Sequence, residues 1–252
     1  MKTLENSFER DVTLPESGGG SREFTDPERA FLEKYVGTGW ENTPEGRALS
    51  RPVTAERVMG PDGGFQAATG KDAVSTDDAG ATAPLGTDSG LAAKAVSGED
   101  VEAGLIAEEE LRLVSFHVSD QVFAVPIMLV QEVLRAVPAT KLPAAPPFLA
   151  GVTNLRGRIT PLVDLAQLLG IPVAGGGQAD NFLIVCRLRD LQIGLLVRAI
   201  DTMYKAPQGD IEWNIESKIG VSADLMAGLL KTGDRLITIL SVSRLFQKVL
   251  KI

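Results

Sequence analysis

Residues 147–169 read PFLAGVTNLRGRITPLVDLAQLL, and charged residues and glycines stand at the ends of its apolar runs. Gly151 and Gly157 enclose a strand-like segment. At each of them a side chain would crowd a turn or a neighbouring backbone, so either can require a positive φ. Arg156 stands at the end of this strand. Asp164 is expected to cap a short helix that follows it. The stretch therefore predicts a strand, a glycine-containing turn and a capped helix.

Three pairs of short apolar runs surround this stretch, and each pair is joined by a two- to four-residue turn. The pairs are 111–118 with 121–126, 182–188 with 191–197, and 225–230 with 235–240. Each pair is typical of a β-hairpin. Many short strands without long crossover helices favour a small barrel, or a pair of barrels, over a layered α/β sheet.

Two further segments have helical features. Residues 127–134, directly after Pro126, are expected to form one or two helical turns. Residues 241–250 predict a terminal helix, with Ser241 or Ser243 as its cap. Its apolar side chains share one face and are Val242, Leu245, Phe246, Val249 and Leu250.

The net charge of this 252-residue chain, −8, is unevenly distributed. Residues 1–108 contain 10 Lys/Arg and 20 Asp/Glu, whereas residues 109–252 contain 15 and 13. Leu, Ile, Val and Phe make up 19 of the first 108 residues. That share is below the roughly one-fifth at which a charged chain buries enough apolar surface to fold. We therefore expect a mostly disordered acidic extension over 1–108 and one folded domain over 109–252.

One segment of the extension has the features of a helix. Thr25 and Glu28 form a capping box and Gly37 follows the last turn, which predicts a short helix near 26–36. An isolated helix of this length is marginal in water. Two interpretations stay open: a nascent helix without a partner, or a docking helix for a partner protein or for its own domain. The docking side chains would be Phe31, Leu32, Tyr35 and Val36.

Residues suited to catalysis are scarce. His117 is the only histidine and Cys186 the only cysteine. Each stands in an apolar strand-like run without the neighbours that a catalytic or metal site requires. We expect Cys186 to be a buried, inert thiol. The sequence thus predicts no enzymatic activity, no cofactor and no bound metal.

The chain has no apolar stretch near the ~18–20 residues that span a bilayer, and its start has no signal-peptide core. Its single cysteine cannot form an intrachain disulfide. We therefore expect a cytoplasmic protein without direct membrane insertion. The near-neutral domain has no stripe of Lys and Arg, so nucleic acid is not an expected partner.

Several motifs together resemble the CheW-like family of chemotaxis coupling proteins. They are VQEV at 130–133, PFLAGVTNLRG at 147–157, ITPLVDL at 159–165, GLLV at 194–197 and the pattern Gly-Leu-x-x-x-Gly-Asp-Arg at 228–235. The resemblance spans the predicted domain and does not reach back before residue 109. It implies two small five-stranded β-barrels around a shared apolar core, with the C-terminal helix packed across them.

The resemblance also implies a non-enzymatic scaffold that is recruited to membrane-associated chemoreceptor arrays. Such proteins bridge the cytoplasmic tips of methyl-accepting chemoreceptors to the regulatory domain of the histidine kinase CheA. The kinase carries a homologous domain of its own. The extension of 108 residues departs from the minimal family pattern. It leaves open an alternative, a CheW-like adaptor of a non-flagellar signalling array in which the N-terminal helix recruits an additional partner.

The resemblance implies a receptor- or kinase-binding region around Glu132 and Arg156. The guanidinium of Arg156 is expected to point out of the barrel, and the Glu132 carboxylate is its candidate partner. Arginine is favoured at interface hot spots. The competing interpretation is an exposed ion pair worth ~0–1 kcal/mol that only pins the preceding helical turn to the barrel.

The other members of the implied region are Val130, Gly151, Val152, Asn154 and Gly157. Asn154 is expected to hold its own loop through backbone hydrogen bonds. Core burial explains the two valines at least as well as contact with a partner.

Overall fold

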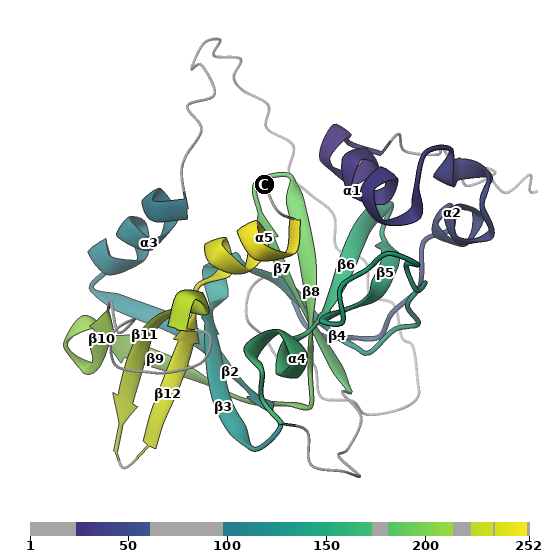
Figure 1. Cartoon of the computed structure of the whole chain (residues 1–252). Helices are drawn as coiled ribbons and strands as arrows, with labels where there is room; N and C mark the ends of the chain where they lie inside the picture. Colours follow the sequence, from purple (N-terminus) through teal and green to yellow (C-terminus); the bar gives the residue numbers. More distant parts are fainter. Residues whose placement is uncertain (1–23, 61–97, 173–180, 214–222, 234, 251–252) are drawn as a thin grey trace, which may run out of the picture.

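The computed structural model describes residues 24–60, 98–172, 181–213, 223–233 and 235–250. Within these residues the chain forms two curled β-sheets side by side, with short helices around them (Figure 1). The mainly β fold predicted from the sequence is confirmed.

Each sheet has six strands in the described part of the chain. In spatial order, one sheet consists of β1 (Arg57–Met59), β4 (Val130–Arg135), β7 (Phe182–Leu188), β8 (Leu191–Val197), β6 (Arg158–Asp164) and β5 (Leu149–Leu155). The other consists of β10 (Ile211–Trp213), β11 (Met226–Thr232), β12 (Arg235–Leu240), β3 (Gln121–Pro126), β2 (Glu110–Val118) and β9 (Ala199–Pro207).

The helices are short. The α-helices are α1 (Asp26–Val36), α2 (Pro44–Leu49), α3 (Gly98–Ala107), α4 (Leu165–Leu169) and α5 (Val242–Leu250). Single 3-10 turns are η1 (Trp40–Asn42), η2 (Ile127–Leu129), η3 (Gln208–Asp210) and η4 (Ala223–Leu225). Helices α4 and α5 begin at the predicted caps. Asp164 Oδ1 accepts a hydrogen bond from Gln167 N at 3.0 Å, and Ser241 Oγ accepts one from Arg244 N at 3.2 Å.

The three predicted hairpins are present as β2–β3, β7–β8 and β11–β12. The stretch 147–169 forms a further hairpin, β5–β6, followed directly by α4. The sequence predicted only one strand and the helix in this stretch.

The predicted helical turns over 127–134 are wrong beyond Leu129. Only η2 is helical, and the chain then continues as β4, which pairs antiparallel with β7 through Val133 and Ile184. Val130 and Val133 are buried in this sheet. Valine is stiff at χ1 and packs well on a pleated surface. Pairing with β7 therefore makes this segment a strand and not a helix.

Each sheet consists of five longer strands and one three-residue strand at its edge. These edge strands are β1 and β10. Strand β10 comes from within residues 109–252, whereas β1 comes from the N-terminal extension. The five-stranded barrels that the resemblance implied are therefore each enlarged by one short strand.

The two sheets share one core. A single buried cluster includes Phe116 and Val125 of one sheet, Ile184 and Ile193 of the other, and Leu245 of α5. Helix α5 lies between the two sheets in Figure 1 and buries one apolar face. This arrangement agrees with the predicted shared core and terminal helix.

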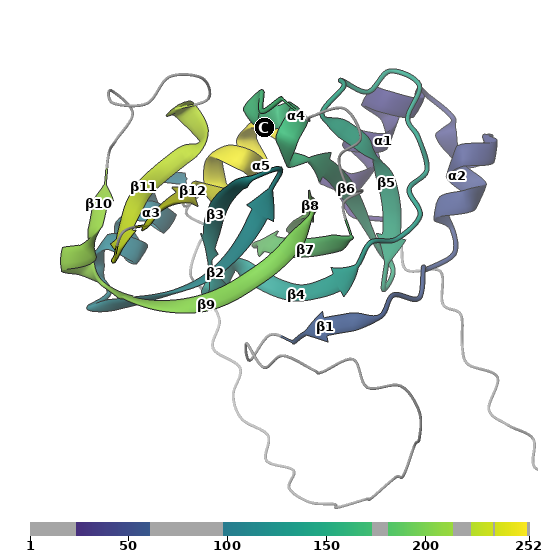
Figure 2. The same ribbon diagram turned by 90° about the horizontal axis from the view of Figure 1, so that it is seen from below.

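Residues 24–60 differ from the expectation of a mostly disordered extension. Helices α1 and α2 lie against the sheet that contains β5 and β6 (Figure 1), and β1 runs alongside β4 (Figure 2). Phe31, Leu32 and Trp40 are buried in the shared core cluster. The low apolar content of the whole extension conceals this segment because its large side chains are concentrated there. Residues 1–23 and 61–97 lie outside the described residues.

A second segment before residue 109 also packs on the domain. Leu105 of α3 is buried in a cluster with Leu111, Ala206 and Ile211. Its carbonyl accepts from Gln208 Nε2 at 2.8 Å. The folded unit therefore begins earlier in the chain than the boundary predicted at residue 109.

Candidate partner-binding face

The turn between β5 and β6 holds Arg156 in a defined position. Arg156 has φ 53° and Gly157 has φ 82°, and positive φ at both central residues is the pattern of a two-residue type I′ turn. Asn154 Oδ1 accepts from Gly157 N at 2.8 Å and closes this turn. The positive φ predicted for Gly157 is present, and the short turn fixes where the Arg156 side chain leaves the sheet.

Glu132 is the buried centre of the site. It lies on β4 and is 2% exposed. Its Oε2 accepts from Arg156 Nη2 at 2.8 Å and from Arg57 Nε at 3.1 Å. The Glu132–Arg156 contact predicted from the sequence is therefore present, although Glu132 comes from a strand and not from a helical turn. The Arg156 side chain is 58% exposed, so a surface guanidinium is held by a buried carboxylate.

Gly151 is a packing residue of this face. Its φ is 151°, and a Cβ at this position would lie 2.6 Å from the backbone oxygen of Thr140. The positive φ predicted there is also present. Val130 and Val152 are both buried in the shared core cluster. These residues shape the sheet beneath Arg156 and do not themselves form its surface.

Asn154 links the turn to the N-terminal extension. Besides closing its own loop, as predicted, it donates from Nδ2 to the Leu49 carbonyl at 2.6 Å. Its backbone carbonyl accepts from Val53 N at 2.7 Å. Asn154 is buried by these contacts.

The predicted docking helix packs on its own domain. Phe31, Leu32 and Tyr35 are buried, and Val36 is half-buried against the same cluster. The predicted capping box is present, with Glu28 Oε2 accepting from Thr25 N at 2.7 Å. The other oxygen of Glu28 accepts from the backbone N–H of Ile159 on β6 at 2.9 Å. One carboxylate thus caps the helix and attaches it to the sheet.

Three contacts of this site were not predicted from the sequence. They are made by the Arg57 side chain, the Leu49 carbonyl and Oε1 of Glu28. Strand β1 is only three residues long, too short for an alternating pattern to be recognised. Leu49 contributes a backbone carbonyl, which no side-chain pattern reveals. Gly37, Gly39 and Pro44 are turn-forming residues, and they were the signal in the sequence that further turns and helices follow α1.

Comparison with known proteins identifies the family of the domain that contains this site. Residues 112–250 match the family model described as the CheW-like domain. The chain belongs to the CheW-like domain family. The sites described above lie within this domain, except for the contributions from residues 24–60, which precede the match.

The relatives of this CheW-like domain include chemotaxis proteins. The probable chemotaxis protein CheW of Rhizobium etli is 33% identical over 136 residues, covering 54% of this chain and 87% of that protein. Chemotaxis protein CheW of Thermotoga maritima is 31% identical over 144 residues, covering 57% and 92%. A crystal structure of the scaffolding protein TtCheW from Thermoanaerobacter tengcongensis is 29% identical, covers 52% of this chain and 88% of that one, and has a TM-score of 0.47.

Two further findings concern only the described residues. No helix among them is long and apolar enough to cross a membrane. In the same residues no three His, Cys, Asp or Glu side chains are grouped so that they would hold a metal ion.

Cys186 of the CheW-like domain is fully buried on β7, and this burial raises the pKa of its thiol to about 12. We expect iodoacetamide to leave the native protein unlabelled at neutral pH and to label it readily in denaturant. Because the folded-state pKa lies above the usual 9.0, the contribution of the neutral thiol to stability is complete below pH 9.0. It is lost progressively as the pH rises toward about 12. Mass spectrometry measures the labelling. Rapid labelling of the native protein would contradict this prediction.

Proposed function

We propose that this protein is a non-enzymatic adaptor that couples methyl-accepting chemoreceptors to the histidine kinase CheA. The proposal is supported by membership of the CheW-like domain family and by relatives that are named chemotaxis proteins. In this role the chain acts in the cytoplasm at membrane-associated receptor arrays. It binds the receptor tip and the regulatory domain of the kinase.

The observation that carries the proposal is the geometry of Arg156. A short turn with positive φ at both central residues sets its backbone, and the buried carboxylate of Glu132 orients its guanidinium. The side chain still faces solvent. A pre-oriented arginine on a rigid hairpin can form a hydrogen-bonded contact with a partner at a small loss of conformational entropy.

The alternative, in which the N-terminal helix recruits an additional partner, is not favoured. The side chains proposed for recruitment, Phe31, Leu32 and Tyr35, are buried against the domain of the same chain. A partner would have to displace α1 before it could reach them.

Reconstitution of kinase control tests the proposal. The full chain is added to receptor-containing membranes and CheA, and autophosphorylation of the kinase is measured with and without the chain. We expect kinase activity to rise by tenfold or more, and to depend on both receptor and adaptor, because a scaffold acts by raising local concentration. Co-sedimentation of the chain with the receptor membranes serves as the binding control. Absence of binding to both receptor and kinase at micromolar protein would overturn the proposal.

A further inference from the structure

Residues 24–59, which we call the cap, close an open seam in the CheW-like domain. Within residues 109–252, β4 and β5 are the edge strands of their sheet. Val53 forms a parallel bridge to Leu155 on β5, and β1 pairs antiparallel with β4 (Figure 2). Arg135 N donates to the Glu56 carbonyl at 2.9 Å. A single segment of the extension therefore pairs with both open edges.

The cap occupies the same face that we propose binds a partner. Arg57 shares the Oε2 atom of Glu132 with Arg156. Asn154 contacts the cap through both its side chain and its carbonyl. A protein that binds around Glu132 and Arg156 through the β4 and β5 edges must therefore take the place of the cap.

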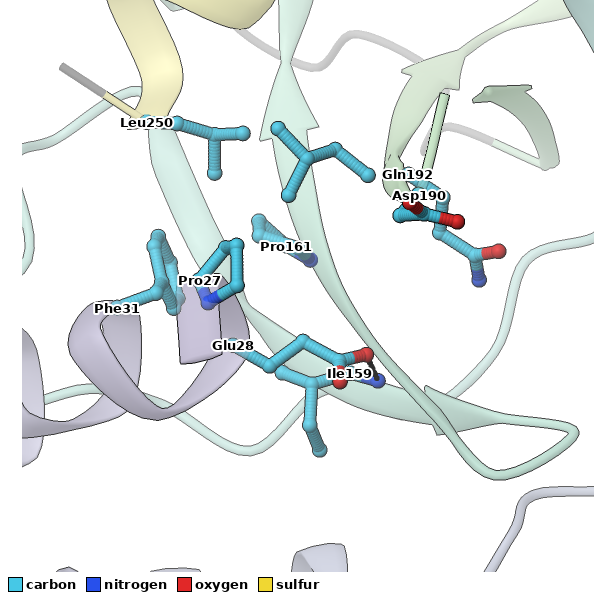
Figure 3. Close-up of a pocket in the computed structure, with 9 residues that line it drawn as sticks. Pro27, Glu28, Phe31, Ile159, Pro161, Asp190, Gln192 and Leu250 are labelled. Carbon is cyan, nitrogen blue, oxygen red and sulfur yellow. Dashed lines mark hydrogen bonds between the residues drawn. The ribbon is translucent and has the colours of Figure 1, made fainter. Parts of the chain in front are cut away.

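The contact between α1 and the domain leaves polar groups without partners. A small cavity of about 10 Å³ lies at this contact. In Figure 3, Pro27, Glu28 and Phe31 of α1 stand on one side and Pro161 and Gln192 on the other. Two polar atoms at this contact are buried without a hydrogen-bond partner in the described part of the chain. They are Gln192 Oε1, beside the cavity, and Tyr35 Oη, elsewhere on α1. Unpaired buried polar groups weaken a contact, so this attachment is less stable than a fully satisfied one.

The rest of the sheet does not depend on the cap for its pairing. Strands β4 and β7, β7 and β8, and β8 and β6 pair among themselves, as do β6 and β5. Helix α1 also carries its own capping box. Release of the cap would expose the outer edge of β4, the end of β5 at Asn154 and Leu155, and an apolar surface, whereas Val152 on β5 stays bridged to Thr140.

We propose that the cap is an intramolecular competitor, which must be displaced before the regulatory domain of the kinase can bind the β4–β5 edges. The inference rests on the proposed function and adds its regulation. The cap satisfies these edges with the backbone of an extended strand, so its competitor must offer a β-edge, as in binding by strand addition. The CheW-like regulatory domain expected in the kinase fits this requirement.

Paired substitutions on α1 of the full chain test this competition. Leu32 is fully buried whereas Ala30 is exposed, so Leu32→Asp releases the cap and Ala30→Asp adds the same charge without doing so. Titration calorimetry measures the Kd for the CheA regulatory domain. Hydrogen exchange measures opening at the amides of Ile159 and Val53. We expect Leu32→Asp to tighten binding about tenfold and to speed exchange at both amides, because apparent affinity scales with the open fraction. Ala30→Asp should match the unmodified chain.

Each other outcome is decisive. Equal or weaker binding by Leu32→Asp, with the β7 and β8 amides still protected, would overturn the competitor while leaving the proposed function standing. If those amides lose protection, the variant has unfolded and Arg57→Ala is used in its place. This substitution removes only the link to Glu132, and the same two measurements then test the competition. Binding of the kinase domain or receptor by none of the proteins would overturn the proposed function and the competitor with it. Tightening toward the receptor tip alone would overturn the choice of partner.

Discussion

Replacement of Gly151 by alanine is expected to destabilise the protein by about 2–4 kcal/mol. The new Cβ would lie 2.6 Å from the Thr140 oxygen, at a φ of 151° that a residue with a side chain rarely adopts. Thr140 cannot retreat easily, because Thr140 N donates to the Val152 carbonyl at 2.8 Å and its own carbonyl accepts from Val152 N at 2.9 Å. Relief of the clash requires these hydrogen bonds to break. Urea denaturation of the variant measures the loss.

Gly209→Ala is the matched control for this substitution. Gly209 is exposed, and a Cβ there would meet no atom within 4 Å. We expect the free energy of unfolding of this variant to stay within about 0.5 kcal/mol of the unmodified chain, as for ordinary surface positions. A loss below about 1 kcal/mol in Gly151→Ala would show that the bridge between Thr140 and Val152 yields readily, contrary to the close packing described here.

Replacement of Arg156 by alanine is expected to lower receptor-dependent kinase activation by tenfold or more while the fold persists. The loss of function follows from the proposed contact, because truncation of an interface arginine commonly costs about 2 kcal/mol or more of binding energy. The fold is expected to survive because Arg57 still neutralises the Glu132 carboxylate. The Arg156 side chain is itself 58% exposed, so solvent screens its share of the pairing with Glu132. Alanine also keeps the Cβ of arginine, so the positive φ adds no new strain.

Arg158→Ala is the control for the loss of a positive charge from the same hairpin. Arg158 Nη1 donates to the Asp190 carbonyl at 2.9 Å and does not contact Glu132. The kinase assay and thermal unfolding are measured on both variants. Full activation by Arg156→Ala, or an equal loss in both variants, would contradict a specific role for Arg156 and would leave it as a structural ion pair.

Local signals predicted much of this structure. Short apolar runs with two-residue turns located the hairpins β2–β3 and β7–β8. The capping signals at Thr25 and Asp164 located the beginnings of α1 and α4. These features depend on residues a few positions apart, whose chemistry is visible in the sequence itself.

The same reasoning failed where distant segments decide the conformation. Residues 130–134 become a strand because β7 pairs with them, and nothing within five residues of Val130 specifies that partner. The Glu132–Arg156 contact was predicted from the sequence, whereas the second arginine that contacts Glu132 is Arg57, on a three-residue strand that the sequence did not predict.

The sequence by itself therefore determined the β-rich domain, its hairpins, its capped helices and the pair of charges at its proposed binding face. Only the tertiary structure decided that residues 24–59 close the seam between β4 and β5 and contact Glu132 and Asn154 at that face. The physical reason is that this closure is made largely by backbone groups, such as the Leu49 and Asn154 carbonyls and the Val53 amide. Every residue carries these groups, so their partners become known only when segments far apart in the chain are brought together.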